Sequence, residues 1–487
     1  MEAAETDQPG SGGGWAALAL ALGLAVAAYA FPLPGVSEEG RRLMSVIAVV
    51  ATLWISEAIP LAVTALLGPT LAVIVGVAKA EVAFAAFGNP IIMLFVGSFL
   101  LARTTFKFAL NERIAYRVLS LDVLANDPTR AFLFLGLTTA VLSAWMSNTA
   151  TTAMMLPIAQ SVLRAMIPVG GGTVPRTFAA GMILVVTYSA SIGGLFTPIG
   201  TPPNLIGIGL IEQATGVRIS FVSWVVRVLP VTAASLFLMM AYFAFLFRKE
   251  KSALVFDRAR MVELYRELGP WTVEQRRVTA ALLVTVALWV VPPILGLLSP
   301  VLGGLLAARL PEAVVPIAVA SALFFVGRGR QGGGALLELG DLARIDWAVI
   351  VLFGGGMCLG DLMIRSGLAD AVGVALAGVI PTGSRPLLVL LFCLLAIGVS
   401  ETTSNTASAN MVVPIVVAVA ARAGGDPVDL GLAATVACTY GFMLPVSTPT
   451  NAMAYATGHV TQRQMIRYGV VLDLIGIALL TFWFGWL

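Results

Sequence analysis

Two short polar segments interrupt the apolar stretches of this sequence, and both read Ser-Asn-Thr-Ala. The first begins at Ser147 and the second at Ser404. Serine, asparagine and threonine offer hydroxyl and amide donors to an oxyanion such as a carboxylate or sulfate. Their oxygens can also replace the water around a small cation. The chemistry available to these residues is therefore reversible binding of an anion together with cations.

A proline-rich segment lies downstream of each polar segment. Residues 197–204 read TPIGTPPN, and residues 444–451 read LPVSTPTN. Proline removes an amide donor and clashes with the preceding turn, so each segment should unwind a helix. Each break would leave free carbonyl groups and a new helix N-terminus, which attracts anions. The sequence thus predicts two broken helices beside the two polar segments.

The composition indicates the environment in which these segments lie. Of the 487 residues, 59% are hydrophobic and only 11% are charged. A soluble protein carries about 25% charged residues, so a soluble fold is excluded. The same numbers exclude disorder and nucleic-acid binding. An integral membrane protein remains, and a span of ~20 residues allows about a dozen spans.

The helices around the two polar segments are predicted to form re-entrant hairpins. Polar backbone at membrane depth is tolerated only where protein or a cavity satisfies it. Two half-length apolar stretches joined by a polar tip fit that condition better than two full spans. We therefore expect hairpins over residues 130–168 and 386–421, with the tips at the two Ser-Asn-Thr segments.

The interruptions form an internal repeat. The tips match at an offset of 257 residues, and the proline breaks match at 247. Upstream, Leu94-Phe95-x-Gly97 matches Leu352-Phe353-x-Gly355 at 258. Because three elements recur in the same order, we predict two repeats, over 42–247 and 278–487. A tail and first helix (1–41) precede them, and a polar segment (248–277) separates them.

The charges predict the topology. Segment 248–277 holds eight basic residues, and loops on the cytoplasmic side collect Lys and Arg. We therefore read it as a cytoplasmic amphipathic linker. Counting outward gives about eleven transmembrane helices plus the two hairpins, a cytoplasmic N-terminus and an external C-terminus; Arg41 and Arg42 then fall outside, against the rule. The hairpins enter from opposite sides, so the repeats are inverted, which is typical of secondary transporters.

Neither tip and neither proline break contains Lys or Arg. An anionic substrate would therefore rely on amides, hydroxyls and bound cations, which indicates coupling to sodium. A membrane enzyme is disfavoured, because the only histidine is His459 and no HExxH motif is present. The three cysteines show no metal-binding spacing. A channel is disfavoured because channels favour symmetric pores with filter loops.

The two Ser-Asn-Thr tips, each with its proline break, resemble the divalent anion/sodium symporter family, and the similarity covers nearly the whole chain. The resemblance implies an all-α integral membrane fold and a homodimer. It also implies a scaffold domain and a transport domain that moves as an elevator. Two or more sodium ions per protomer would accompany the substrate.

The resemblance also implies which residues bind. The substrate would contact residues of both tips and both breaks: Ser147, Asn148, Thr149, Thr201, Ser404, Asn405, Thr406, Thr448 and Pro449. One sodium ion would bind Ser143, Ser147, Asn148 and the Gly200 backbone. The other would bind Ser400, Ser404, Asn405 and the Ser447 backbone. The second break has Pro449-Thr450 where the first has Pro202-Pro203, so equal geometry is not expected.

The function that these features predict is sodium-coupled symport of C4-dicarboxylates such as succinate, malate and fumarate. The alternatives within the same fold are sodium-independent dicarboxylate exchange, or transport of sulfate or a tricarboxylate. The hydroxyls of Ser143 and Ser400 favour a symporter. We expect the protein in a bacterial inner membrane, in contact with lipid and with no nucleic-acid partner.

A few charged residues fall inside apolar stretches. Glu401 lies three residues before the second tip, where it could act in transport or only cap the hairpin backbone. Asp473 lies inside the last span and has no assigned role. Asp361 and Arg365 are four residues apart, which favours a structural pair on one helix. Glu57 is expected at the interface, and His459 in an ordinary inside loop.

Overall fold

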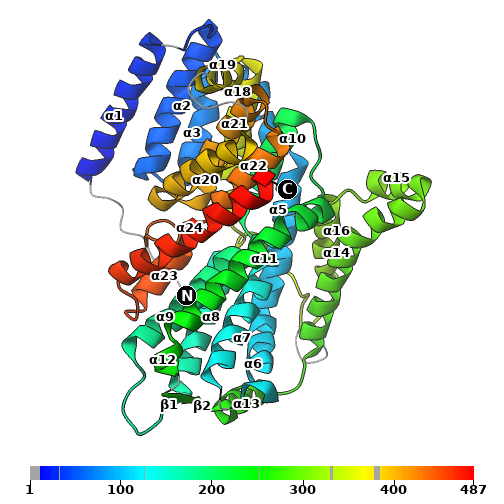
Figure 1. The fold of residues 1–487 in the computed structure, drawn as a ribbon. Coiled ribbons are helices and arrows are strands. Elements are labelled where there is room, and N and C mark those ends of the chain that lie inside the picture. The colour runs from blue at the N-terminus through cyan, green and yellow to red at the C-terminus, as the bar shows by residue number, and fades with distance from the viewer. Residues whose placement is uncertain are drawn as a thin grey trace.

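The computed structural model describes residues 11–31, 33–125, 127–251, 253–328, 333–377 and 384–486, and most of these residues are helical (Figure 1). This agrees with the predicted all-α class. The predicted tail falls mostly on residues 1–10, which lie outside the described residues.

The helices of the first half follow one another as α1 (Ser11–Ala30), α2 (Glu38–Ser56), α3 (Leu61–Ile74), α4 (Ala80–Ala85), η1 (Ala86–Gly88), α5 (Pro90–Lys107), α6 (Leu110–Leu119), η2 (Asp122–Leu124), α7 (Pro128–Ser143), α8 (Asn148–Arg164), α9 (Arg176–Gly193), α10 (Pro202–Thr215) and α11 (Phe221–Leu246). Asn89 and Asp127 cap α5 and α7 through their side chains, and each is followed by a proline at the first helical position. Both arrangements satisfy or remove amides that a helix start leaves unpaired.

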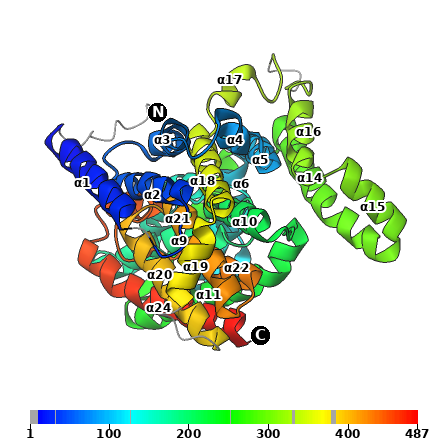
Figure 2. The ribbon, with the colours of Figure 1, turned by 90° about the horizontal axis from the view of Figure 1, so that it is seen from above.

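The rest of the chain forms α12 (Arg248–Lys251), α13 (Arg258–Glu267), α14 (Val273–Leu298), α15 (Pro300–Arg309), α16 (Val314–Leu323), α17 (Leu339–Leu342), α18 (Trp347–Arg365), α19 (Leu368–Ala377), α20 (Arg385–Thr402), α21 (Asn405–Ala423), α22 (Pro427–Ala437), α23 (Pro449–Ala456) and α24 (Gln462–Trp486). A capping box between Thr272 and Gln275 starts α14. Helix α1 and the α14–α15 arm lie at opposite edges of the molecule (Figures 1 and 2).

Eight helices among the described residues are long and apolar enough to cross a membrane. They include α11, α14, α18 and α24, whereas α3, α7, α16 and α22 are shorter apolar helices. Much of α14 is exposed, as expected for a surface in contact with lipid or a second protein. The chain is therefore an integral membrane protein, and the predicted count of about eleven spans stays a prediction.

Both predicted hairpins are pairs of adjacent helices. Helices α7 and α8 join at residues 144–147, and α20 and α21 join at 403–404. The first hairpin ends at Arg164, earlier than the predicted residue 168, because β1 (Met166–Pro168) follows it. Strand β1 pairs antiparallel with β2 (Leu254–Phe256) of the linker. The sequence prediction contained no strand, so this small sheet is a correction to it.

Each proline break joins two helices of one broken pair. The unwound residues are 194–201 between α9 and α10, and 438–448 between α22 and α23. Pro202 and Pro449 each occupy the first turn of the following helix, where proline is tolerated. The unwinding begins upstream of the predicted residues 197 and 444, at Gly194 and Cys438.

The two halves cross at matched glycines. A Cβ added at Gly97 of α5 would lie 2.5 Å from the backbone nitrogen of Ile317 in α16, and one added at Gly355 of α18 would collide with the Ala65 carbonyl of α3. Helix α3 thus packs on α18, and α16 packs on α5. The matched rings of Phe95 and Phe353 meet edge to face, with centroids 5.5 Å apart. Each half therefore contributes a helix to the other half's packing.

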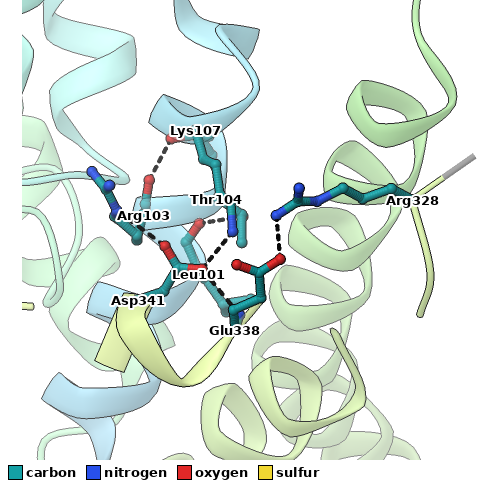
Figure 3. Close-up of polar contacts among 9 residues, drawn as sticks. Leu101, Arg103, Thr104, Lys107, Arg328, Glu338 and Asp341 are labelled. Carbon is teal, nitrogen blue, oxygen red and sulfur yellow. Dashed lines mark hydrogen bonds and ion pairs between the residues drawn. The ribbon is translucent and has the colours of Figure 1, made fainter. Parts of the chain in front are cut away.

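An ionic cluster fixes the loop before α18 to the end of α5 (Figure 3). The buried carboxylate of Asp341 lies 2.6 Å from Lys107 Nζ and 3.5 Å from Arg103 Nε. It also accepts the amide of Glu338, whose own side chain pairs with Arg328 at 2.6 Å. The cluster connects α5 to α17, two segments far apart in the sequence.

Candidate binding site

The first tip is organised by a contact between Ser143 and Asn148. Ser143 ends α7, and its Oγ lies 2.9 Å from Asn148 Oδ1 and 2.7 Å from the Ala190 carbonyl oxygen. The Asn148 amide donates to Thr201 Oγ1 at 3.2 Å. Ser147 caps α8 by accepting the amide of Ala150. One hydroxyl, one amide oxygen and one carbonyl thus converge beside the first break.

The second tip repeats this arrangement. Ser400 Oγ lies 2.8 Å from Asn405 Oδ1 and 2.6 Å from the Cys438 carbonyl oxygen. Ser404 caps α21 by accepting the amide of Ala407 at 3.2 Å. The Asn405 amide donates to the Thr439 carbonyl at 3.5 Å, the outer limit for such a bond, and not to a threonine hydroxyl.

Each break is held by a buried asparagine. The amide of Asn204 donates to the carbonyls of Gly194 and Thr197, at 2.9 and 2.8 Å. Asn451 donates in the same way to Gly441 and Leu444, at 2.8 and 3.0 Å. Both asparagines end the two proline-rich segments of the repeat, and the sequence alone assigns them no binding role. Because an unwound segment loses its amide donors, a side-chain amide that satisfies two carbonyls at once stabilises it.

The breaks differ where Gly200 corresponds to Ser447. A Cβ at Gly200 would lie 2.5 Å from the Gly194 carbonyl oxygen and 2.9 Å from that of Ser143. In the second half, the Ser447 hydroxyl lies 2.8 Å from the Ser400 carbonyl oxygen and 3.2 Å from that of Gly441. The same two carbonyls are therefore crowded against backbone in one half and hydrogen-bonded in the other.

The predicted substrate residues lie at helix starts. Thr201 and Thr448 are the N-cap residues of α10 and α23, and Pro449 is the first residue of α23. The side chain of Thr448 caps α23 by accepting the backbone N–H of Asn451. The side chain of Thr201 instead accepts the side-chain amide of Asn148. Thr149 is exposed at its tip, and Thr406 is half-buried. Helix N-termini and accessible hydroxyls can together receive an oxyanion.

Contacts between the halves join each broken helix to the hairpin of the other half. Helix α23 packs against α8 of the first hairpin, and α10 packs against α21 of the second. A direct polar contact joins Ser191 of α9 to Thr450 of α23, with 3.4 Å between their hydroxyl oxygens. Each broken helix therefore contacts the hairpin of the other half.

The region lacks a buried cation of its own. Among the described residues, Arg113 is the one basic side chain that is buried, and it binds the carbonyls of Leu268, Gly269 and Pro270 in the linker. No three His, Cys, Asp or Glu side chains converge on a metal position in the described part of the chain. A cation here would have hydroxyl, amide and carbonyl oxygens as ligands, which suits sodium rather than a transition metal.

Glu401 is an additional functional candidate. Its two carboxylate oxygens accept the amides of Met443 and Leu444, at 2.7 and 3.0 Å. Glu401 therefore caps the backbone of the second break. Capping was one of the two roles expected from the sequence, although the hairpin backbone was the expected partner. At the matched position the first half has Ala144, whose carbonyl accepts the Thr197 hydroxyl. Asp473 is also buried in this part of the molecule.

The remaining polar residues lie elsewhere. Asp361 and Arg365 form an ion pair at 2.6 Å, as predicted for a structural pair. His459 is exposed, and Glu57 ends α2 as an exposed residue in the left-handed conformation. An apolar cavity of about 670 Å³ between α5, α10, α11 and the α14–α16 arm reaches Pro198 of the first break, but neither tip lines it.

Comparison with known proteins places this geometry in a family. The model of a family described as the sodium:sulfate symporter transmembrane region matches residues 14–487. The sodium-dependent dicarboxylate transporter SdcS of Staphylococcus saprophyticus is 30% identical over 452 residues, covering 91% of this chain and 85% of the relative. An uncharacterized transporter of Haemophilus influenzae is 32% identical over 440 residues, covering 90% and 89%.

Two solved structures share the fold. The YdaH transporter of Alcanivorax borkumensis superposes with a TM-score of 0.53 at 16% identity, over 83% of this chain and 87% of that one. MtrF of Neisseria gonorrhoeae gives a TM-score of 0.54 at 14% identity, over 82% of each chain. At such low identity the likeness concerns the fold alone.

Proposed function

The chain belongs to the sodium:sulfate symporter family, and from this membership we propose that it is a secondary active transporter that carries C4-dicarboxylates together with sodium. Relatives named sodium-dependent dicarboxylate transporters support both the cation and the substrate class. Succinate, malate and fumarate are the substrates we expect. Neither the family description nor the relatives' names denote an enzyme.

The observation that carries the proposal is the repeated contact of a serine hydroxyl with an asparagine amide oxygen. It occurs at 2.9 Å between Ser143 and Asn148, and at 2.8 Å between Ser400 and Asn405. Each pair presents oxygens suited to one sodium ion, and each asparagine begins a hairpin helix whose N-terminus favours an anion. Because the one buried basic side chain among the described residues, Arg113, binds carbonyls of the linker, the bound sodium would supply the positive charge.

In the proposed mechanism, sodium binds first and orders the tips. One ion takes oxygens from Ser143, Ser147, Asn148 and the Gly200 backbone, and the other takes oxygens from Ser400, Ser404, Asn405 and the Ser447 backbone. The dicarboxylate then binds between the tips, with Thr149, Thr201, Thr406, Thr448 and Pro449 lining its site. Each carboxylate receives hydroxyls and a helix N-terminus from one half.

The movement that we propose is an elevator, in which both hairpins travel with their broken helices against a scaffold. We further propose a homodimer in a bacterial inner membrane, with a cytoplasmic N-terminus and linker and an external C-terminus. The contacts of α23 with α8 and of α10 with α21 support one moving body that includes both halves.

The test uses purified protein in liposomes. We expect labelled succinate to accumulate under an inward sodium gradient and not when choline replaces sodium. Equal uptake in choline would contradict sodium coupling. A thermal-shift panel of dicarboxylates, tricarboxylates and sulfate, each with and without sodium, would rank the substrates, because a ligand that binds the folded state raises its apparent stability.

A second candidate is sulfate or tricarboxylate transport by the same site, and the family description, which names sulfate, favours testing it. Competition by sulfate without competition by succinate would select this candidate. Sodium-independent counterflow of succinate would instead identify an exchanger.

A further inference from the structure

A second cavity, of about 1130 Å³, lies where three segments of the chain meet beside the linker. The segments are the end of α8, residues 173–179 with the start of α9, and residues 458–464, which lead from α23 into α24. The hydroxyl of Thr177 in α9 donates to the Glu250 carboxylate of α12 at 3.0 Å, which places the cavity next to the linker. None of the binding residues proposed above lines it.

The lining of this cavity is basic. Among the described residues that line it, Arg164, Arg176 and His459 carry ionisable side chains, and none is acidic. All the lining residues come from segments 157–179 and 449–472, which contain no Asp or Glu. Because basic groups gathered in a concave surface create a positive potential there, the cavity attracts anions.

Neither arginine of the cavity has an acidic partner among the described residues. Arg164 ends α8, and its Nη2 donates to Ser161 Oγ, three residues earlier, at 3.0 Å. The ion pairs of the described residues include neither Arg164 nor Arg176. A guanidinium group binds phosphate oxygens through parallel hydrogen bonds, so both side chains suit a phosphate-bearing anion.

The start of α9 adds backbone donors to the same cavity. Its N-cap residue, Pro175, makes no side-chain cap, and Arg176 and Ala179 of its first turn line the cavity. Helix α24 also begins at the cavity, but there Thr461 caps the helix by accepting the backbone N–H of Gln464. The amides of a helix start that lacks a side-chain cap can bind an oxyanion, so α9 offers donors that α24 already uses.

We propose that this cavity binds a phosphate-bearing anion, with Arg164 and Arg176 on the phosphate oxygens and the first amides of α9 beside them. The side chain of Gln464, whose oxygen is taken by Thr461, keeps its NH₂ group as a further donor, and His459 supplies another. A cavity of this size holds a molecule larger than one phosphate group. The phosphate therefore belongs to a lipid headgroup or to a soluble phosphorylated molecule.

The bound anion would connect the two halves of the chain. Arg164 and Arg176 belong to the first repeat, whereas His459 and Gln464 belong to the second. A ligand that contacts both halves only when the chain is folded raises the apparent stability of the protein. The site goes beyond the proposed function, because it uses no residue of the tips or breaks.

The experiment measures binding of inorganic pyrophosphate to the purified full chain in detergent by isothermal titration calorimetry. We expect the wild type to bind, and a double variant with Arg164→Gln and Arg176→Gln to bind about tenfold more weakly or less. Both arginines are exposed, so the double variant should fold as the wild type does. Arg309→Gln is the matched control, because Arg309 is an exposed arginine at the end of α15, and its affinity should not change.

A second measurement separates the two sources of phosphate. Thermal unfolding is followed in phosphatidylcholine nanodiscs with and without phosphatidylglycerol. If the ligand is a headgroup, phosphatidylglycerol should raise the Tm of the wild type and of Arg309→Gln more than that of the double variant. If the ligand is soluble, pyrophosphate should raise the Tm in this way and phosphatidylglycerol should not.

Two results would overturn the inference. One is a wild type on which neither pyrophosphate nor phosphatidylglycerol acts, and this result decides whether or not the double variant folds. The other is a double variant that keeps the wild-type response to both probes, because binding would then occur elsewhere. Absence of sodium-driven succinate uptake would refute the proposed function and leave the outcome of these binding measurements unchanged.

Discussion

The two half-sites share one hydrogen-bond plan and differ in how it is supported. In both, a serine contacts the tip asparagine, and a second asparagine holds two carbonyls of the break. The first half supports this plan by tight backbone packing at Gly200. The second half uses side chains, with the Ser447 hydroxyl and the Glu401 carboxylate bound to the break.

Equivalent positions in the two halves therefore need not respond equally to substitution. A backbone contact fails when any side chain is added, because nothing can move aside. A hydrogen-bonded contact weakens by the value of its bonds, about 0.5–1.5 kcal/mol each. Substitutions at the two tips should therefore have similar effects, and substitutions at the two breaks should have different effects.

The largest effect is expected at the tips, where the halves are alike. Asn148→Ala and Asn405→Ala each remove an amide that contacts a serine hydroxyl, so each should reduce succinate uptake about 100-fold, or about 3 kcal/mol. Initial rates in liposomes measure this, and size-exclusion chromatography checks that assembly is retained. Wild-type uptake by either variant would show that its tip does not bind.

The breaks should separate the halves. Gly200→Ala places a Cβ 2.5 Å from the Gly194 carbonyl oxygen, so the sodium concentration for half-maximal uptake should rise tenfold or more. Ser447→Ala removes hydroxyl contacts to two carbonyls and should raise it only about fivefold, from about 1 kcal/mol. Sodium titrations of succinate uptake measure both. Equal shifts would contradict the distinction between backbone and side-chain support.

A smaller contrast is expected at the helix starts. Thr201→Val leaves the Asn148 amide without its hydroxyl partner and should raise the KM for succinate a few-fold. Thr448→Val removes a helix cap and should lower the free energy of unfolding by about 1 kcal/mol, with less effect on KM. Uptake kinetics measure the KM, and thermal unfolding measures the loss of stability. If Thr448→Val shifted KM more, the two roles would be reversed.

Substitution of Asp341 in the ionic cluster should affect neither half-site. Burial acts to raise the pKa of Asp341, but the bond from Lys107, the Glu338 amide and the charge of Arg103 together lower it. Asp341→Asn should therefore leave the KM for succinate unaltered while costing about 1–3 kcal/mol of stability at neutral pH, less than a fully buried pair. Thermal unfolding in detergent measures the loss.

The pH dependence follows from the lowered pKa of Asp341. The stabilisation by its carboxylate is complete above the unfolded pKa of about 3.9 and is lost as the pH falls through the lower folded value. The difference between wild type and Asp341→Asn should therefore be constant near neutrality and shrink below about pH 4. A difference that grew on acidification would contradict the assigned ion pairs.

The sequence predicted the elements of the site better than their connections. The tips and breaks could be located because proline and polar residues in apolar stretches have few alternative explanations. The clamps by Asn204 and Asn451 were missed, although both residues recur in the repeat, because their partners are carbonyls and any residue supplies a carbonyl. The contact of Glu401 with Met443 was not predictable, since it joins segments 42 residues apart through backbone amides.

The ends of elements were also beyond the sequence. Unwinding starts at Gly194 and Cys438, upstream of the prolines, because the carbonyls there are taken by side chains and not by the next helical turn. The pairing of β1 with β2 depends on bringing the linker against the end of the first hairpin. Neither result follows from local preference.

The crossings at Gly97 and Gly355 have a mechanical consequence. Where two backbones touch without side chains between them, no rotamer can change to let one helix slide past the other. Shear at either crossing would open a void or force a collision, so α5 with α16, and α18 with α3, behave as stiff joints. Large displacements within the chain must therefore occur at other positions, and a bulky residue at Gly97 would disrupt the packing of α5 on α16.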